Sequence, residues 1–386
     1  MSTLKVINSI HPSGSTNNLV FDNAGNTTAG GTLAMSSSFL RNRIINGAQT
    51  IDQRNAGAAV TVNNTGLYIT DRFIVEDGTT TGVLSAQQVT DAPTGYTNSL
   101  KVTATTGTGA VGASEYSVIT QIIEGYNIYD FSWGSASAVS VTVSFWVKAT
   151  TTGTYSLTLY NNGATRINPQ PFTINASNTW EYKTVSIVGD TTGTWLTNNG
   201  RGVVVNFYTT IGTTYQSSAG WNGSSKYGVT GSTNAFVTTG NTFAITGVQL
   251  EVGSVATPFE RRLYGQELYF CQRYLQRLSP TASSTNPFLA TASMFNSTVI
   301  FPSGQFTQPM RAVPTLILEG AVSNYAFFVM SAGTYLTATG LTLNAVTTNT
   351  FFFIQGTVTT GATAGQISYL AGNSQNTLGI QFSAEL

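Results

Sequence analysis

The sequence predicts an all-β protein: a jelly-roll β-sandwich, a linker helix and a smaller C-terminal β-sandwich domain, preceded by an extended N-terminal segment. Two observations carry this prediction. Short runs rich in Thr, Val and Tyr alternate polar with apolar residues, and Gly and Asn separate them, which is typical of antiparallel strands. Hydrophobic residues make up 41% of the 386 residues, so the chain can bury sizeable cores although only 8% of it is charged.

The N-terminal segment, residues 1–46, differs from the rest. Its stretches LKVINSI and NNLVFD read as short strands, and DNAGN at 22–26 is a strong turn signal. So few apolar residues cannot build a core of their own. We expect the segment to become ordered against other chains or a partner, with a flexible tail as the alternative.

Strand patterns recur from residue 47 to residue 262 and predict the jelly roll. In each of three runs an aromatic residue lies on the strand face opposite the alternating apolar residues. They are Trp146 in VTVSFWVK, Tyr160 in YSLTLY and Tyr208 in GVVVNFY. Period-two alternation over many short strands predicts two packed antiparallel sheets.

The alternation stops at residues 263–280, where apolar residues recur at helical spacing and Pro280 follows. The periodic positions are Tyr264, Leu268, Cys271, Leu275 and Leu278. This predicts a linker helix over 263–280. Strand-like runs then resume and predict a second, smaller β domain over 281–386.

Composition excludes several classes of function. Sixteen Lys and Arg balance sixteen Asp and Glu without a basic run, which disfavours nucleic-acid binding. A single cysteine, Cys271, and a single histidine, His11, predict no internal disulfide and neither a metal nor a cofactor site of the Cys or His type. DNAGN lacks the glutamate that a calcium loop requires at its twelfth position, so we interpret it as a turn.

The chain shows no membrane-targeting pattern. MSTLKVINSI lacks the apolar core of a signal peptide, and no apolar run approaches the roughly 20 residues that span a bilayer. We therefore expect a chain made in a cytoplasm without membrane insertion. Its near absence of charge is typical of proteins held in an assembly, with a neutral monomer as the alternative.

Several motifs resemble tailed-bacteriophage tail fibre and minor tail structural proteins. They are FLRNRIINGAQTIDQRNAG (39–57), YITDRF (68–73), TWEYKTVSI (179–187) and GVQLEVGSVATPFERRLYGQELYFCQRYL (247–275), followed by QPMRAVPTLIL near the C-terminus. The middle domain is similar to a carbohydrate-binding-module jelly roll. The resemblance implies a homotrimer on the tail or capsid surface of a virion, assembled in the host cytoplasm. SGSTNNLVFDNAGNTTAGG resembles modules that join phage fibres to the virion, which implies that residues 1–46 attach the chain to other virion proteins.

The resemblance favours a host surface polysaccharide as the external binding partner. Sugar rings stack their apolar C–H faces on aromatic rings, while amides and carboxylates bind the hydroxyl groups. We expect the strand aromatics to converge on one concave sheet, and the loop tryptophans to be exposed in Gly- and Asn-rich surroundings. The candidate glycan-binding residues are Trp146, Tyr160, Tyr208, Trp133, Trp195 and Trp221. The alternative is that these rings pack a second layer, a loop base or a subunit interface.

Catalysis is the weaker hypothesis. Glycoside hydrolysis needs two carboxylates about 5–10 Å apart. Candidates are Asp71, Glu76, Asp77, Glu115, Glu124 and Asp130, but no spacing singles out a pair, and long parallel β-helix repeats are absent from the sequence. We therefore expect a non-enzymatic protein, with a glycan depolymerase as the less favoured alternative.

Charges gather where the last strand of the jelly roll, a Pro-containing corner and the predicted helix meet. They are Glu251, Glu260, Arg261, Arg262, Glu267 and Arg273. Arginine fixes carboxylates two bonds at a time, so we expect ion pairs that hold the domains, and the subunits of a trimer, in one orientation. The alternative is a helix that caps a monomer.

These expectations combine into a trimeric tail fibre, or similar appendage, that adheres to host glycans without catalysis. The alternative is a head fibre or a capsid decoration protein with an architectural role.

Overall fold

A computed structural model describes residues 8–9, 19–21, 27–29, 40–279, 286–374 and 378–386. The chain divides into two units, Met1–Arg41 and Asn42–Leu386. In the first unit, β1 (Asn8–Ser9), β2 (Leu19–Phe21) and β3 (Thr27–Ala29) form a small antiparallel sheet in that order. The two predicted strands are therefore present. The predicted turn at 22–26 lies outside the described residues.

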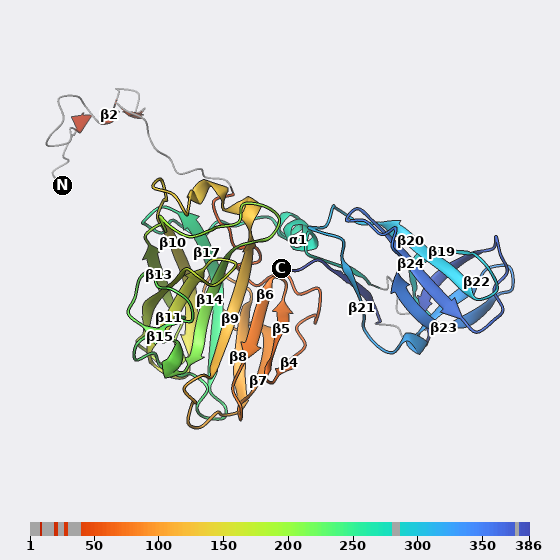
Figure 1. Cartoon of the computed structure of the whole chain (residues 1–386), viewed down its shortest axis with the longest axis horizontal. Helices are drawn as coiled ribbons and strands as arrows, with labels where there is room; N and C mark the ends of the chain where they lie inside the picture. The colour runs from red at the N-terminus through yellow and green to blue at the C-terminus, as the bar shows by residue number, and fades with distance from the viewer. Residues whose placement is uncertain (1–7, 10–18, 22–26, 30–39, 280–285, 375–377) are drawn as a thin grey trace, which may run out of the picture. The chain divides into compact units, whose positions relative to one another are not determined.

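The second unit begins with a sandwich of two six-stranded sheets (Figure 1). The first, here the β10 sheet, has the order β13 (Glu181–Ile187), β10 (Val141–Ala149), β17 (Thr242–Val252), β8 (Ser99–Thr106), β7 (Val83–Val89) and β4 (Val60–Val62). The second, here the β14 sheet, has the order β12 (Ile167–Ile174), β11 (Gly153–Tyr160), β14 (Arg201–Ile211), β9 (Tyr116–Glu124), β6 (Phe73–Asp77) and β5 (Thr65–Thr70). Short 3₁₀ helices occur at Gly125–Asn127, Tyr129–Phe131, Thr213–Tyr215 and Val322–Asn324.

The sandwich core comes from the alternation that the sequence shows. Phe145 on β10 and Phe207 on β14 are buried, and their rings meet edge to face at 4.8 Å between the sheets. Leu157 on β11 joins the same cluster. Because alternate residues point outward, Trp146 and Tyr208 lie on outer faces. The predicted all-β sandwich is confirmed.

Residues 42–46 belong to the sandwich rather than to the N-terminal segment in which the sequence placed them. Arg43 N donates to Leu250 O at 2.8 Å, Asn42 Nδ2 donates to Val248 O at 3.2 Å, and Ile44 is fully buried. Gly47 allows the close approach, since a side chain there would meet the Val248 carbonyl oxygen at 2.1 Å. This short segment covers β17, a long-range contact that composition does not reveal.

The predicted helix is shorter than 263–280. Helix α1 spans Tyr264–Gln272, and Leu275–Leu278 form strand β18. Strand β18 pairs with β26 (Ile380–Ser383), which pairs in turn with β21 (Thr315–Leu318). Backbone pairing with a strand about a hundred residues later outweighs the helical spacing of Leu275 and Leu278.

The C-terminal domain is a closed six-stranded barrel, not the predicted sandwich. Its order is β19 (Phe288–Met294), β20 (Val299–Gln305), β24 (Phe351–Val358), β23 (Thr334–Leu343), β22 (Tyr325–Val329) and β25 (Ile367–Gly372). Closure occurs because β19 pairs with both β20 and β25. Phe327, Ile354 and Leu370 fill its interior. Alternation identifies strands but does not tell whether the last strand returns to the first.

Candidate functional site

A cavity of about 370 Å³ opens on the outer face of the β14 sheet. Its lining is dominated by Tyr116, Tyr160, Tyr208, Tyr215 and Tyr227, and we call it the tyrosine cavity. Aliphatic side chains of β6 and β9 complete the floor, and Glu76, Thr120, Asn206 and Arg201 supply polar groups.

Sheet and loop build the cavity together. Tyr208 on β14 lies opposite Val118 of β9 on one side and Ser156 of β11 on the other, so it occupies the middle of the sheet. The loop that carries β15 (Gln216–Ser217) and β16 (Gly228–Val229) folds over the β11 side of this face. Ser156 anchors it, since its Oγ accepts from Val229 N at 2.9 Å. The loop thereby forms one wall of the cavity, to which it contributes Tyr215, Ser225 and Tyr227.

The tyrosine rings support one another. Tyr116 meets Tyr215 at 6.0 Å and 84°, and Tyr160 meets Tyr227 at 5.7 Å and 70°. Tyr208 lies 6.0 Å from Tyr227 and is only 6% exposed, whereas the other four tyrosines are half-buried. Edge-to-face packing fixes each ring before any ligand arrives.

The polar groups are also pre-oriented. Thr120 Oγ1 donates to Asn206 Oδ1 at 2.7 Å, and Asn206 Nδ2 donates to the Tyr208 hydroxyl at 3.0 Å. The Tyr116 hydroxyl donates to the Glu76 carboxylate. Each of these groups retains further hydrogen-bonding capacity. The cavity therefore offers fixed donors and acceptors beside ring faces.

Burial keeps the phenols neutral. Desolvation raises the pKa of Tyr160 to about 12, and the neighbouring Tyr227 adds to the effect. Desolvation also raises the pKa values of Tyr116, Tyr208 and Tyr227, and the hydrogen bond to Glu76 reinforces the effect at Tyr116. At neutral pH the tyrosines present hydroxyl groups and no phenolate charge.

The structure separates the three strand aromatics. Tyr160 and Tyr208 line the tyrosine cavity, whereas Trp146 lies on β10, in the other sheet. The expectation of one shared sheet is wrong for Trp146, because alternation shows which face a residue takes and not which sheet its strand joins. Tyr215 and Tyr227 were not among the residues predicted from the sequence. They lie in the same Gly- and Ser-rich stretch as Trp221, whose surroundings made it a candidate.

The loop tryptophans form a packed cluster instead of exposed platforms. Trp133 and Trp195 are each 8% exposed, and their rings lie 4.6 Å apart. Trp221 meets Trp133 at 5.4 Å and Trp195 at 5.6 Å. The indole N–H groups donate inward, for example from Trp133 to Val139 O at 2.8 Å. The exposed-indole expectation is wrong for Trp133 and Trp195, and the loop-base alternative describes the cluster.

Of the six candidate acids, Glu76 alone lines the tyrosine cavity. The others have structural partners: Asp71 with Gln53, Asp77 with Thr79, Glu115 with Thr80, Glu124 with Arg273, and Asp130 with Arg43. The cavity therefore does not present a pair of carboxylates. Within the described part of the chain, no group of three or more His, Cys, Asp or Glu side chains could hold a metal ion. No helix in that part is long and apolar enough to cross a membrane.

The charges near the corner act within the chain. Arg262 donates to Ile44 O at 3.1 Å and to Glu267 at 3.3 Å, and Asn42 N donates to Glu260 at 2.7 Å. These contacts tie residues 42–46 to Glu260 and Arg262, which follow β17, and to Glu267 of α1.

The remaining junction residues are also engaged. Glu251 accepts from Thr257 N at 2.8 Å, and Arg261 lies over the Tyr96 ring at 4.7 Å. Arg273 forms a two-bond pair with Glu124, at 2.8 and 2.6 Å. These contacts all lie within one chain, and the role of these residues as a junction between domains or chains stays a prediction.

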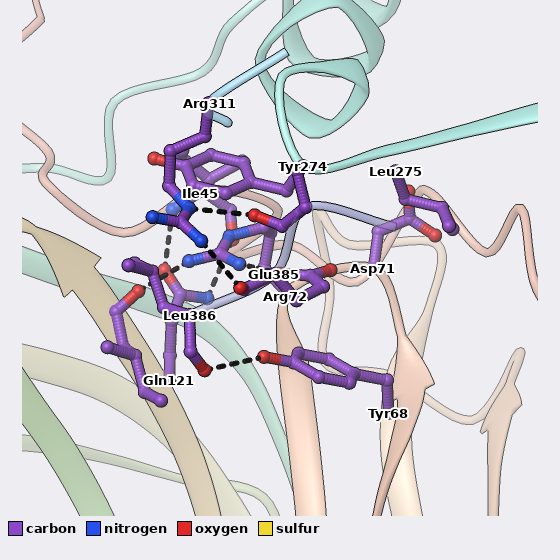
Figure 2. Close-up of polar contacts among 12 residues, drawn as sticks. Ile45, Tyr68, Asp71, Arg72, Gln121, Tyr274, Leu275, Arg311, Glu385 and Leu386 are labelled. Carbon is purple, nitrogen blue, oxygen red and sulfur yellow. Dashed lines mark hydrogen bonds and ion pairs between the residues drawn. The ribbon is translucent and has the colours of Figure 1, made fainter. Parts of the chain in front are cut away.

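A second charged network, which the sequence analysis missed, joins the sandwich to the C-terminal residues. Figure 2 shows Arg72 reaching Glu385 and lying against the ring of Tyr274. The guanidinium of Arg72 is 3.6 Å from the centre of that ring, and the Tyr274 hydroxyl donates to Glu124 at 2.7 Å. Arg311 donates to Ala384 O at 2.7 Å and to Glu385 O at 2.9 Å. A chain of charges and rings thus links both domains.

Comparison with known proteins gives fold-level similarity only. No family model and no curated protein matches the sequence. One similar solved structure is the enzymatically active domain of bacteriophage CBA120 tailspike protein 4, at 15% identity and a TM-score of 0.29; the match covers 55% of this chain and 22% of that one. A putative sugar binding protein from Bacteroides thetaiotaomicron matches at 11% identity and a TM-score of 0.33, over 55% of this chain and 100% of that one.

A third similar structure is the family 11 carbohydrate-binding module from Clostridium thermocellum in complex with a β-1,3-1,4-mixed-linked tetrasaccharide. It matches at 13% identity and a TM-score of 0.27, over 50% of this chain and 97% of that one. At these identities and TM-scores, the three structures assign no ligand and no residue role to this chain.

Proposed function

We propose that the chain is a bacteriophage virion structural protein, a trimeric tail fibre or similar appendage that adheres to host surface glycans without catalysis. The tyrosine cavity carries the glycan part of this proposal. Its volume of about 370 Å³ lies within the roughly 300–1,000 Å³ of ordinary ligand sites. It combines neutral aromatic rings with an oriented amide and one carboxylate, the groups that recognise a sugar.

The mode of binding follows from the geometry. A sugar ring lies with its C–H face against the half-buried tyrosines, and its hydroxyl groups bind Asn206 and Glu76. Because the rings and the amide are already held by hydrogen bonds and edge-to-face contacts, binding orders few side chains. Glu76 has no second carboxylate beside it in the cavity lining, which favours adhesion over glycoside hydrolysis.

The virion part of the proposal rests on the sequence motifs at 39–57, 68–73 and 247–275. In this proposal, the N-terminal unit, Met1–Arg41, attaches the chain to other virion proteins. Three copies then present three weak sites, and avidity replaces a tight single site. The alternative, a head fibre or capsid decoration protein, gains support from the charged network that links the sandwich to the C-terminal residues, because such a network suits an architectural part.

Two experiments test assembly and location. The mass of the full chain in solution, measured by light scattering, is expected at three times 40.8 kDa. A monomeric mass contradicts the trimer. Antibody labelling of virions in the electron microscope should decorate the tail; label on the capsid shell would instead support the alternative.

A binding experiment tests the cavity. We expect Tyr160→Ala to weaken adsorption to surface polysaccharide purified from the host by about tenfold or more, since a stacked ring contributes on the order of 1 kcal/mol beyond its area. Tyr126→Ala is the matched control, because Tyr126 is 55% exposed outside the cavity. Polysaccharide length should stay constant during incubation. Equal adsorption by both variants, or shortened polysaccharide, contradicts the proposal.

A further inference from the structure

The outer face of the β10 sheet carries a second hollow, shallow and about 770 Å³ in volume. Trp146 on β10 and Tyr182 on β13 are direct cross-strand neighbours, with ring centres 5.5 Å apart. Tyr182 is 43% exposed. Tyr96 and Phe259, whose rings meet at 5.4 Å, line the same hollow. Two pairs of aromatic rings thus lie at one open surface.

Cations adjoin this aromatic surface. Lys148 lies two residues beyond Trp146 on the same face of β10. Ala244 of β17 pairs with Lys148 on one side and with Lys101 of β8 on the other. Both lysines line a smaller hollow of about 340 Å³. The short side chain of Ala244 therefore leaves space between two ammonium groups.

One anion balances part of this charge. Asp91 accepts from Lys148 Nζ at 2.8 Å and from Trp180 Nε1 at 3.2 Å. The hydrogen bond from Lys148 holds the pKa of Asp91 below its ordinary value, so this carboxylate is ionised at neutral pH. Two lysines against one aspartate leave the hollow net positive.

We propose that this surface, the aromatic–lysine face, binds an acidic polysaccharide of the uronic-acid type. A sugar ring stacks on Trp146 and Tyr182, and a carboxylate of the same polymer reaches the ammonium groups of Lys101 and Lys148. The exposed hydroxyl group of Thr184, which lines the aromatic hollow, binds a sugar hydroxyl. Charge complementarity selects an acidic polymer, and the aromatic pairs select a sugar over a simple anion.

This face is separate from the tyrosine cavity, because the two lie on the outer sides of different sheets. The inference therefore goes beyond the proposed host adhesion and fails independently of it. Loss of polygalacturonate binding in variants of the β10 sheet tests the aromatic–lysine face. Loss of host-polysaccharide adsorption in Tyr160→Ala tests the tyrosine cavity.

Polygalacturonate and its fully methyl-esterified form are the probes, because they share a sugar backbone and differ in charge. By titration calorimetry on the full chain at low salt, we expect the acid form to bind about tenfold more tightly than the ester. Tyr182→Ala and Lys101→Gln should each weaken binding of the acid form by about three- to tenfold. The Lys101→Gln effect should shrink at high salt, since salt screens exposed charges.

Two controls accompany these variants. Lys226→Gln removes the same charge from the loop beside the tyrosine cavity, and Tyr160→Ala alters that cavity; neither should change polygalacturonate binding. Equal binding of the acid and ester forms overturns the proposal, as does unchanged binding by both Tyr182→Ala and Lys101→Gln. If Tyr182→Ala instead dissociates an oligomer, a second copy of the chain covers this face and the proposal fails.

Discussion

At the scale of single residues, the sequence predicts which face of a strand a side chain occupies, but it does not predict which other side chains lie beside it. Alternation correctly placed Tyr160, Tyr208 and Trp146 on faces that turn away from the core. It did not show that Trp146 belongs to the other sheet, because strand order is set by pairings between distant segments. Tyr215 and Tyr227 reach the cavity from a loop, where no period exists to place a side chain.

Tyrosine ionisation gives a prediction at this scale. Burial raises the pKa of Tyr160 from its ordinary value of 10.0 to about 12. A raised folded-state pKa contributes stability that is fully present below pH 10 and is lost as pH rises through 12. Glycan binding should therefore stay constant from about pH 6 to pH 9, and the melting temperature should fall above pH 10.

Spectrophotometric titration at 295 nm, paired with thermal melting, measures both quantities. Tyr160→Phe removes one of the phenols with a raised pKa and should lessen the alkaline fall in melting temperature. A phenol titration complete near pH 10, or no difference between the two proteins, contradicts the prediction.

At the scale of elements, local sequence patterns predicted that the helix exists but not where it ends. The helix exists, but it ends at Gln272 because residues 275–278 pair with β26. The loop tryptophans had the composition of an exposed surface, yet edge-to-face contacts among three indoles outweigh it. The three indoles come from three different loops: Trp133 precedes β10, Trp195 lies between β13 and β14, and Trp221 lies between β15 and β16. A local sequence pattern does not show that these loops meet.

The tryptophan cluster yields a stability prediction. Trp133→Ala removes a side chain that packs against Phe131, Trp195 and Trp221, so the free energy of unfolding should fall by about 3–5 kcal/mol. Chemical denaturation followed by tryptophan fluorescence measures it. Tyr126→Ala, which removes an exposed aromatic side chain from the 3₁₀ helix Gly125–Asn127, should change the free energy by less than about 0.5 kcal/mol. Equal effects of the two substitutions contradict a structural role for the cluster.

At the scale of the whole molecule, the sequence predicted a charged junction and the structure supplies its connections. Arg262 joins residues 42–46 to α1, as the gathering of charge near the corner indicated. The pairing of Arg54 and Arg72 with Glu385 spans more than 300 residues, and no local signal marks it. Contacts of this length follow from the fold and become visible only with it.

Glu385 gives a prediction for the junction. Its carboxylate is held between Arg54 and Arg72, whose side chains are 10% and 2% exposed. Glu385→Gln leaves these buried cations without their anion, so the free energy of unfolding should fall by about 3 kcal/mol. Denaturant titration measures the change. Asp130→Asn is the control, since its pair with Arg43 is more exposed and should contribute less than about 1 kcal/mol. Similar losses in both variants contradict the assignment.

The closed barrel affects how copies of the chain associate at high protein concentration. A chain with sixteen positive and sixteen negative residues has no long-range repulsion to keep its copies apart at high concentration. In the barrel every strand is already bonded on both sides, so an adjacent copy finds no open backbone there to extend into a fibril. The barrel itself thus offers no edge for strand addition, and removal of one barrel strand would expose two such edges.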